Sequence, residues 1–178
     1  MSLHAIKRLR LDGIWWLVSP QNLLKPSKGM APFEERLRRA RALTRPHPRL
    51  WATDLEARLG TRYSADTLRE LRQRFPGARF VWLMGADNLR DFHRWRRWDN
   101  IFAAVPIAVF RRPGYGAGRC RGKAAIRFDA AWRDLRAAAS LATTTPPAWL
   151  MLDNALNRLS ATQLRQNKTV QTPHRKGT

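Results

Sequence analysis

The stretch at residues 80–101, FVWLMGADNLRDFHRWRRWDNI, joins an apolar run to a turn of small residues and then to a tryptophan-rich amphipathic segment. A continuous apolar run predicts a strand buried on both faces of a parallel sheet. Such sheets bind ligands just beyond the carboxyl ends of their strands, and Asp87 stands at that point. Gly85 allows a sharp turn and the close approach of a ligand, and Asp87 can accept hydrogen bonds from ribose hydroxyls or an exocyclic amine.

The tryptophans Trp95 and Trp98 lie three residues apart, which predicts that they share one face of a helix. Aromatic residues at this spacing usually pack into the core, and that interpretation is favoured for Trp98. Trp95 lies one turn earlier and closer to the strand end. We therefore expect Trp95, more than Trp98, to offer a surface on which a ring-bearing ligand stacks.

Outward from this block, apolar and amphipathic segments alternate along the whole chain. Strands are expected at 14–20, 49–55, 79–85, 105–110 and 148–152, and helices at 2–11, 32–43, 66–75, 129–141 and from about 162. Alternation at this interval predicts an α/β fold with a Rossmann-like, doubly wound parallel sheet, in a single domain over residues 1–165. Residues 166–178 are polar and without pattern, and we expect them to form a disordered tail.

The composition suits a cytoplasmic protein. The 178 residues contain no apolar run of the ~18 residues that a membrane span needs, and the single cysteine excludes an internal disulfide. The formal charge of +21 would attract polyanions at low salt. However, the basic residues are spread along the chain as pairs and triplets rather than gathered in one stripe, so dedicated nucleic-acid binding is the less favoured interpretation.

Three further segments could meet anionic groups. In LSATQLR (residues 159–165), Ser160 and Thr162 stand at an expected helix start, and Arg165 lies one turn beyond, which is either a phosphate site or a capped helix with a solvated arginine. In SPQNLLK (19–25), Lys25 lies in a loop after a strand and could meet a polyphosphate or only solvent. In RYSADTL (62–68), Ser64 could cap a helix beginning near residue 66, or its turn could hold a carboxylate.

Together these segments carry a family resemblance. The block GADNLRDFHRWRRW resembles the signature of bacterial nicotinate-nucleotide adenylyltransferases, roughly G-x-D-x-L followed by F-x-x-W. The other three segments resemble that family's S-P-x-N-P-x-K, Y-[TS]-x-x-T-L and I-S-[SA]-T-x-[IL]-R motifs, and all four stand in the family's order. One departure is Leu23, which replaces the second proline of the first motif.

The resemblance implies a nucleotidyltransferase-type fold and adenylyl transfer from ATP to nicotinate mononucleotide, giving deamido-NAD and pyrophosphate in NAD biosynthesis. Mg²⁺ would accompany ATP as substrate. Acceptors such as pantetheine phosphate, used elsewhere in the superfamily, are the second choice. The implied ATP-binding residues are Ser160, Thr162, Arg165, Asp87 and Lys25, and the implied nicotinate nucleotide-binding residues are Ser64, Trp95, Gly85 and, through its main chain, Arg96.

The family also has an opening segment, G-x-F-[ND]-P-x-H-x-G-H, which this sequence does not contain. That segment supplies a central strand and the histidines that bind the triphosphate, and His4 is no substitute for them. We therefore expect a sheet interrupted at its centre, and the catalytic residues are unknown. The open alternatives are a mis-chosen start within a longer reading frame, a truncated inactive homologue, and a basic polyanion- or RNA-binding protein.

Overall fold

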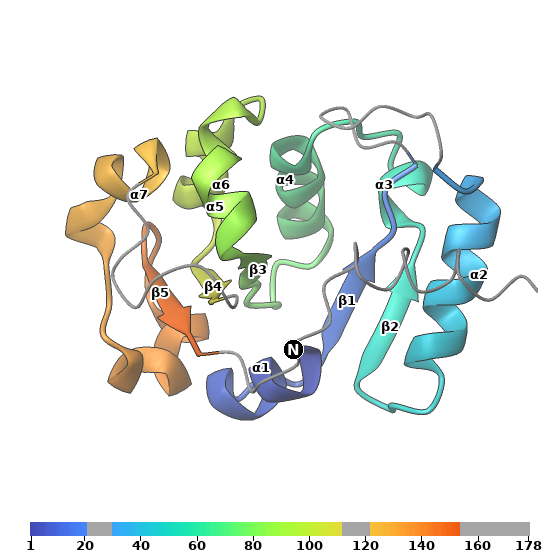
Figure 1. Cartoon of the computed structure of the whole chain (residues 1–178), viewed down its shortest axis with the longest axis horizontal. Coiled ribbons are helices and arrows are strands. Elements are labelled where there is room, and N and C mark those ends of the chain that lie inside the picture. The colour runs from blue at the N-terminus through green and yellow to red at the C-terminus, as the bar shows by residue number, and fades with distance from the viewer. Residues whose placement is uncertain (21–29, 112–121, 154–178) are drawn as a thin grey trace, which may run out of the picture.

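The computed structural model describes residues 1–20, 30–111 and 122–153, and these form an α/β fold (Figure 1). The strands are β1 (Ile14–Leu17), β2 (Leu50–Thr53), β3 (Trp82–Gly85), β4 (Ile107–Phe110) and β5 (Trp149–Leu152). The α-helices are α1 (Ser2–Leu9), α2 (Phe33–Thr44), α3 (Leu55–Arg58), α4 (Ser64–Arg74), α5 (Ala86–Asp91), α6 (Trp98–Ala104) and α7 (Lys123–Arg127). Three 3₁₀ helices complete the order: η1 (Phe92–Arg94), η2 (Asp129–Ala131) and η3 (Leu135–Thr143).

All the strand pairs among these residues are parallel, which confirms the predicted sheet type. β1 pairs with β2, with Ile14 opposite Leu50. β3, β4 and β5 form a second sheet in that order. Within the described part of the chain, β1 pairs only with β2 and β3 only with β4, so the sheet is interrupted between β1 and β3, as expected.

The core lies on both faces of the larger sheet. Ile107 and Val109 of β4 belong to a cluster that includes Phe92, Phe102 and Trp149. The alternate β4 residues belong to a second cluster, which reaches α1, β1 and η3 and comprises Ala5, Ile6, Leu9, Ile14, Leu50, Ala108, Phe110, Ala138, Leu141, Ala148, Leu150 and Leu152. Because successive strand residues face opposite sides, the continuous apolar run of β4 is buried on both faces.

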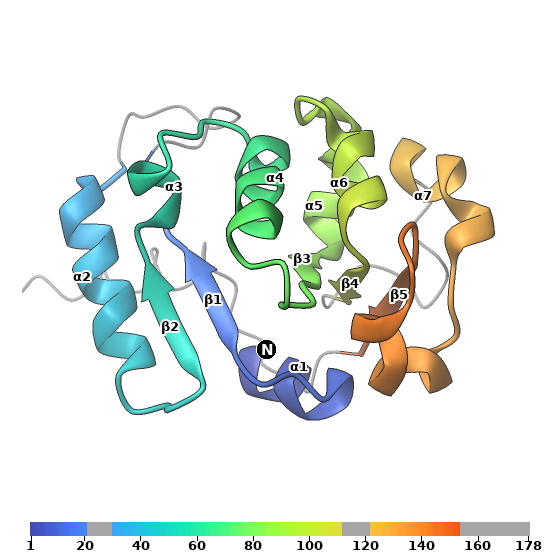
Figure 2. The ribbon, with the colours of Figure 1, turned by 180° about the vertical axis from the view of Figure 1, so that it is seen from behind.

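The arrangement of the helices follows from this double burial. α5, α6 and α7 supply residues to the first cluster, and α1 packs against η3 on the other side. Figure 2, seen from behind, shows α1 beside the foot of β1 and α2 along the outer side of β2. None of the described helices combines the length and the apolar character that crossing a bilayer requires.

The prediction of a single helix after Gly85 in the tryptophan block (residues 80–101) is wrong. The chain forms α5, then the 3₁₀ helix η1, and then three residues that precede α6. Arg97, the residue before α6, has φ 53° and ψ 38°, a left-handed conformation that cannot continue a right-handed helix. Trp95 and Trp98 therefore belong to different local structures and do not share one helical face.

The expected helix at 129–141 is also different in form. It divides into η2 and η3, and the side chain of Asp134 accepts a hydrogen bond of 2.9 Å from the amide of Arg136 at the start of η3. An aspartate in this position satisfies a helix-terminal amide that would otherwise lack a partner. The sequence pattern thus located the helical segment but not its 3₁₀ geometry.

Candidate functional site

The predicted site residues divide into two groups. Lys25, Ser160, Thr162 and Arg165 lie outside the described residues. Gly85, Asp87, Ser64, Trp95 and Arg96 lie within them, on β3, on α5, at the start of α4 and in the segment between η1 and α6.

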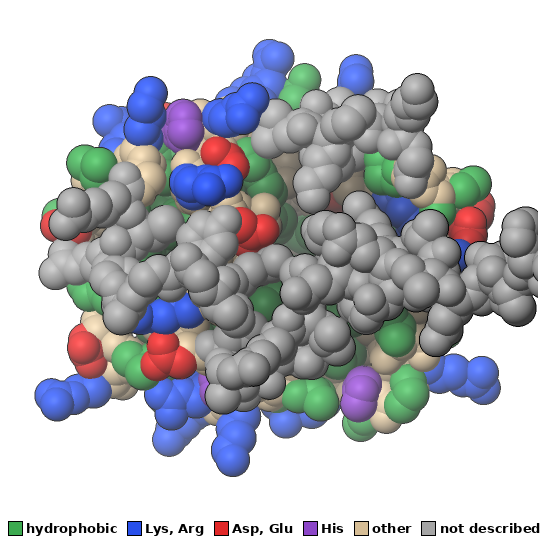
Figure 3. Space-filling model, in the orientation of Figure 1, with side chains coloured by type: hydrophobic (Ala, Val, Ile, Leu, Met, Phe, Trp, Pro, Cys, Tyr) green, Lys and Arg blue, Asp and Glu red, His purple; other side chains and the backbone are tan. Residues whose placement is uncertain are grey.

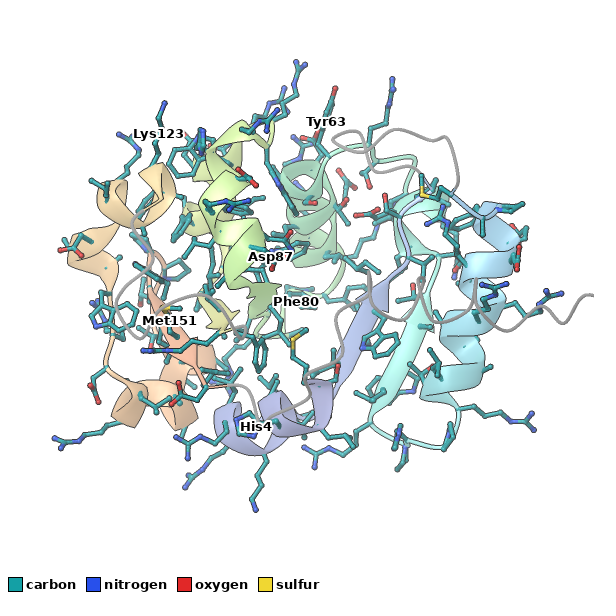
Figure 4. All side chains as sticks on the ribbon, in the orientation of Figure 1. His4, Tyr63, Phe80, Asp87, Lys123 and Met151 are labelled. Carbon is teal, nitrogen blue, oxygen red and sulfur yellow. The ribbon has the colours of Figure 1, made fainter. Side chains whose placement is uncertain are left out.

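Gly85 and Asp87 stand where the apolar run predicted them. Gly85 is the last residue of β3, is buried and directly precedes α5, with φ −85° and ψ 157°. The turn from strand to helix is therefore made in a conformation that other residues also adopt. Asp87 is half-buried in the first turn of α5, and Figure 4 shows it near the centre of the molecule. Its carboxylate lies at the strand's carboxyl end, where it can accept hydrogen bonds from a ligand.

Trp95 is held by two aromatic neighbours. Its ring centroid lies 5.0 Å from that of Phe92 and 6.3 Å from that of Trp82, the latter at an interplanar angle of 86°. The side chain is half-buried against the core. An indole held at its edges in this way is oriented before any ligand arrives, which lowers the entropic cost of stacking.

Trp98 packs against the core as expected. Its ring lies 5.7 Å from Phe128, 6.2 Å from Phe102 and 6.5 Å from Phe92, all in edge-on geometry. Edge-to-face pairs of this kind stabilise aromatic clusters beyond simple burial. Both tryptophans are half-buried against the same core cluster, and they differ in their neighbours: Trp98 contacts three phenylalanine rings, whereas Trp95 contacts Phe92 and Trp82.

The segment after Trp95 reaches the start of α4. The Arg96 guanidinium lies 5.0 Å from the centre of the Tyr63 ring. The neighbouring Arg97 donates from Nη1 to Oδ1 of Asp66 at 2.8 Å. These two contacts bring the tryptophan segment and the Ser64 turn side by side, from positions about thirty residues apart in the sequence.

The start of α4 differs from the expectation. The helix begins at Ser64 and not near residue 66, Tyr63 occupies the N-cap position, and no side chain caps this end. The amides of Asp66 and Thr67 bond to the carbonyl of Tyr63 at 3.0 Å each. The amides of Ser64 and Ala65 open the helix and have no carbonyl within it to bond, so they can hold an anion such as a carboxylate.

A cavity of about 260 Å³ lies next to this turn, and sequence reasoning missed it. It is lined by Ser19, Pro20, Glu56, Ala57, Gly60, Thr61 and Arg62. Gly60 has φ 65°, a conformation that favours glycine. No local pattern marks Glu56, because the four-residue helix α3 is too short to show a period.

Glu56 is a buried acid in the lining of this cavity. Its residue is 9% exposed. Burial raises the pKa of the Glu56 carboxyl above its ordinary value, and a hydrogen bond from the Ser19 side chain acts in the opposite direction. The carboxylate therefore ties the chain just after β1 to the helix just after β2.

Charge is distributed widely over the molecule. Where Figure 3 shows coloured side chains, Lys and Arg lie along the upper and lower edges of this face, with a few nearer its middle. Among the residues that the structure describes, no group of three or more His, Cys, Asp or Glu side chains could hold a metal ion. The described site therefore offers stacking, amide and cationic groups for a ligand, rather than a protein-bound metal centre.

Comparison with known proteins finds relatives that share one family name. The family model described as cytidylyltransferase-like matches residues 3–167. A probable nicotinate-nucleotide adenylyltransferase of Cereibacter sphaeroides (strain ATCC 17025) is 54% identical over 165 residues, which are 93% of this chain and 86% of that protein. One from Methylorubrum extorquens is 47% identical over 93% of this chain and 89% of that protein.

A solved structure shares the fold. The nicotinic acid mononucleotide adenylyltransferase of Plasmodium falciparum, complexed with NaAD, superposes with a TM-score of 0.62 at 12% identity, over 92% of this chain and 74% of that one. At so low an identity the likeness concerns the fold alone.

Proposed function

Because this chain belongs to the nicotinate-nucleotide adenylyltransferase family, we propose that it transfers the adenylyl group of ATP to nicotinate mononucleotide, forming deamido-NAD and pyrophosphate. The observation that carries the proposal is the contact of Arg96 with Tyr63, because it places the Trp95 segment beside the Ser64 turn. An aromatic surface next to helix-start amides suits an aromatic ring that bears a carboxylate.

The acceptor would lie between these two segments. Trp95 would stack on the nicotinate ring, while the amides of the Ser64 turn and the main chain of Arg96 would hold its carboxylate. Gly85 would allow the nucleotide to approach the end of β3, and Asp87 would accept hydrogen bonds from ribose or adenine of ATP. Each role agrees with the position of the residue, and none requires its side chain to react.

The reaction needs no protein nucleophile. A phosphate oxygen of nicotinate mononucleotide attacks the α-phosphorus of ATP, and the bond from that phosphorus to the oxygen bridging the β-phosphate breaks. Pyrophosphate leaves with the electron pair. Catalysis then consists of holding the two phosphates in line and neutralising charge on the leaving group.

The phosphates of ATP would be held by Ser160, Thr162 and Arg165, where the sequence predicts the start of a helix, with Lys25 as a further cation. Mg²⁺ would enter with ATP as part of the substrate. We place the reaction in the cytoplasm, as the sequence predicts.

The proposal is tested by measuring pyrophosphate release. The purified chain, and a form extended by the residues encoded in frame upstream, are supplied with ATP and nicotinate mononucleotide, with nicotinamide mononucleotide and pantetheine phosphate as competing acceptors. We expect nicotinate mononucleotide to be turned over faster than either competing acceptor. If neither form releases pyrophosphate with this acceptor, the proposed function is wrong.

A further inference from the structure

Arg36, on α2, binds both ends of the segment that carries Lys25. Its Nη1 and Nη2 atoms donate to the carbonyl oxygens of Ser19 and Pro20, each at 2.7 Å, and its Nε donates to the carbonyl of Ala31 at 3.0 Å. Ser19 and Pro20 come just before residues 21–29, and Ala31 comes just after them. One planar guanidinium therefore holds the described main chain on both sides of residues 21–29.

Glu56 holds the same place from the opposite side. Its carboxylate accepts a hydrogen bond from the Ser19 side chain. Ser19 is thus fixed twice, through its carbonyl by Arg36 and through its hydroxyl by Glu56. Just before it, the amide of Val18 bonds to the carbonyl of Thr53 at 3.0 Å, which continues the pairing of β1 with β2.

The contacts continue from Glu56 to the Ser64 turn. The amide of Thr61 donates to the carbonyl of Glu56 at 3.1 Å. The hydroxyls of Thr61 and Thr67 share a hydrogen bond of 2.7 Å, and the Thr67 hydroxyl donates to the carbonyl of Tyr63 at 3.2 Å. Thr67 is fully buried, so these bonds are shielded from competing water.

We infer that Arg36 and Glu56 are positioning residues, which set the start of the Lys25 segment relative to the Tyr63–Ser64 turn. Neither side chain needs to touch a substrate. Arg36 acts through three main-chain carbonyls, and the Glu56 side chain acts through Ser19, while the main chain at position 56 is bonded to Thr61. The kinetic part of this inference rests on the proposed function, whereas the structural part does not.

The structural part is tested by hydrogen exchange of the whole chain without substrate. Arg36→Lys keeps the charge but cannot make the three-pronged contact, and Arg38→Lys changes an exposed arginine of the same helix as the matched control. We expect the Val18 amide to exchange about tenfold faster in Arg36→Lys than in Arg38→Lys, since each lost hydrogen bond loosens the end of β1. Equal exchange in the two variants would overturn the inference.

Glu56 is tested with two substitutions. Glu56→Gln keeps an acceptor for the Ser19 hydroxyl, whereas Glu56→Leu removes it. We expect Glu56→Leu to accelerate exchange at Val18 and Glu56→Gln to restore most of the protection. Ser19→Ala should add nothing further in the Glu56→Leu background, because both changes remove the same bond. If the effects of Ser19→Ala and Glu56→Leu on exchange at Val18 add together, Glu56 does not act through its hydrogen bond with Ser19.

The kinetic part is read from kcat/KM for ATP in the extended, active form. Misplaced binding groups can cost a hundredfold in rate, so we expect Arg36→Lys and Glu56→Leu to lose about tenfold or more, with Arg38→Lys unchanged. A role confined to stability would lower Tm and leave the kinetics of the folded fraction unchanged, which would overturn the positioning role. If wild-type protein shows no turnover, the proposed function fails, and the exchange measurements still decide the structural part.

Discussion

At the scale of single residues, Trp95 and Trp98 are the same amino acid in different environments. Trp98 is surrounded by three phenylalanine rings, whereas Trp95 contacts Phe92 and Trp82 and lies in the segment that reaches Tyr63. A stacked ring contributes about 1–3 kcal/mol to binding. We expect Trp95→Ala to raise the KM for nicotinate mononucleotide about tenfold and the KM for ATP far less, measured by steady-state kinetics of the active form.

Trp98→Ala is the control for this prediction. Removing this half-buried indole should lower the free energy of unfolding, by less than the ~3–5 kcal/mol of a fully buried aromatic, and leave the ratio of the two KM values unchanged. If Trp95→Ala raises both KM values equally, Trp95 does not stack on the acceptor.

The raised pKa of Glu56 predicts how the stability of the fold depends on pH. Because burial raises the pKa of Glu56 in the folded state, the folded protein holds this proton more tightly than the unfolded chain does. The contribution of Glu56 to stability is therefore greatest in acid and falls as pH rises above the ordinary carboxyl value of 4.5. Glu56→Gln should remove this fall, so that the variant gains stability relative to wild type as pH rises above 4.5.

Denaturant unfolding at several pH values measures this difference. Glu35→Gln, at an exposed i,i+4 pair with Arg39 on α2, is a suitable control, since such surface pairs contribute little. A difference between Glu56→Gln and wild type that does not change with pH would contradict the assigned cause.

At the scale of elements, the end of α1 is set by the conformation of one residue. Arg10 follows the helix with φ 51° and ψ 42°, and its amide bonds to the carbonyl of Ile6. This left-handed position favours glycine, which has no Cβ to strain the turn. We expect Arg10→Gly to stabilise the protein by about 1 kcal/mol, or to raise Tm by about 2–4 °C.

The matched control is Arg8→Gly. It removes the same side chain and the same charge from within α1, where glycine costs about 1 kcal/mol. Thermal unfolding of the two variants should therefore shift Tm in opposite directions. Shifts of the same sign would mean that lost arginine contacts, and not backbone conformation, determine the effect.

The tryptophan block shows what pattern can predict at this scale. The strand β3 and its end at Gly85 were predicted, because a buried parallel strand leaves a continuous apolar run. The division into α5, η1 and α6 was not, because arginine at position 97 carries no local signal for a left-handed conformation. Its contact with Asp66 is a long-range one, which no helical period contains.

At the scale of the whole molecule, the net charge of +21 is the dominant property. The basic residues are spread along the sequence as pairs and triplets, which suits weak, non-specific attraction to polyanions. We expect binding of a random-sequence single-stranded RNA, followed by fluorescence anisotropy, to be measurable near ~0.05 M salt and lost above ~0.15 M. Micromolar or tighter binding at ~0.15 M salt would instead favour a dedicated polyanion-binding role.

The sequence by itself determined the parallel α/β fold, the family, and the positions of Gly85 and Asp87 at a strand end. Each of these follows from apolar runs and short motifs, which involve residues close together in the sequence. Only the tertiary structure decided that Arg96 lies against Tyr63 and that Arg36 and Glu56 meet at Ser19. The physical reason is distance along the chain. Apolar periods specify which faces are buried, whereas contacts between separate elements depend on how the buried faces pack together.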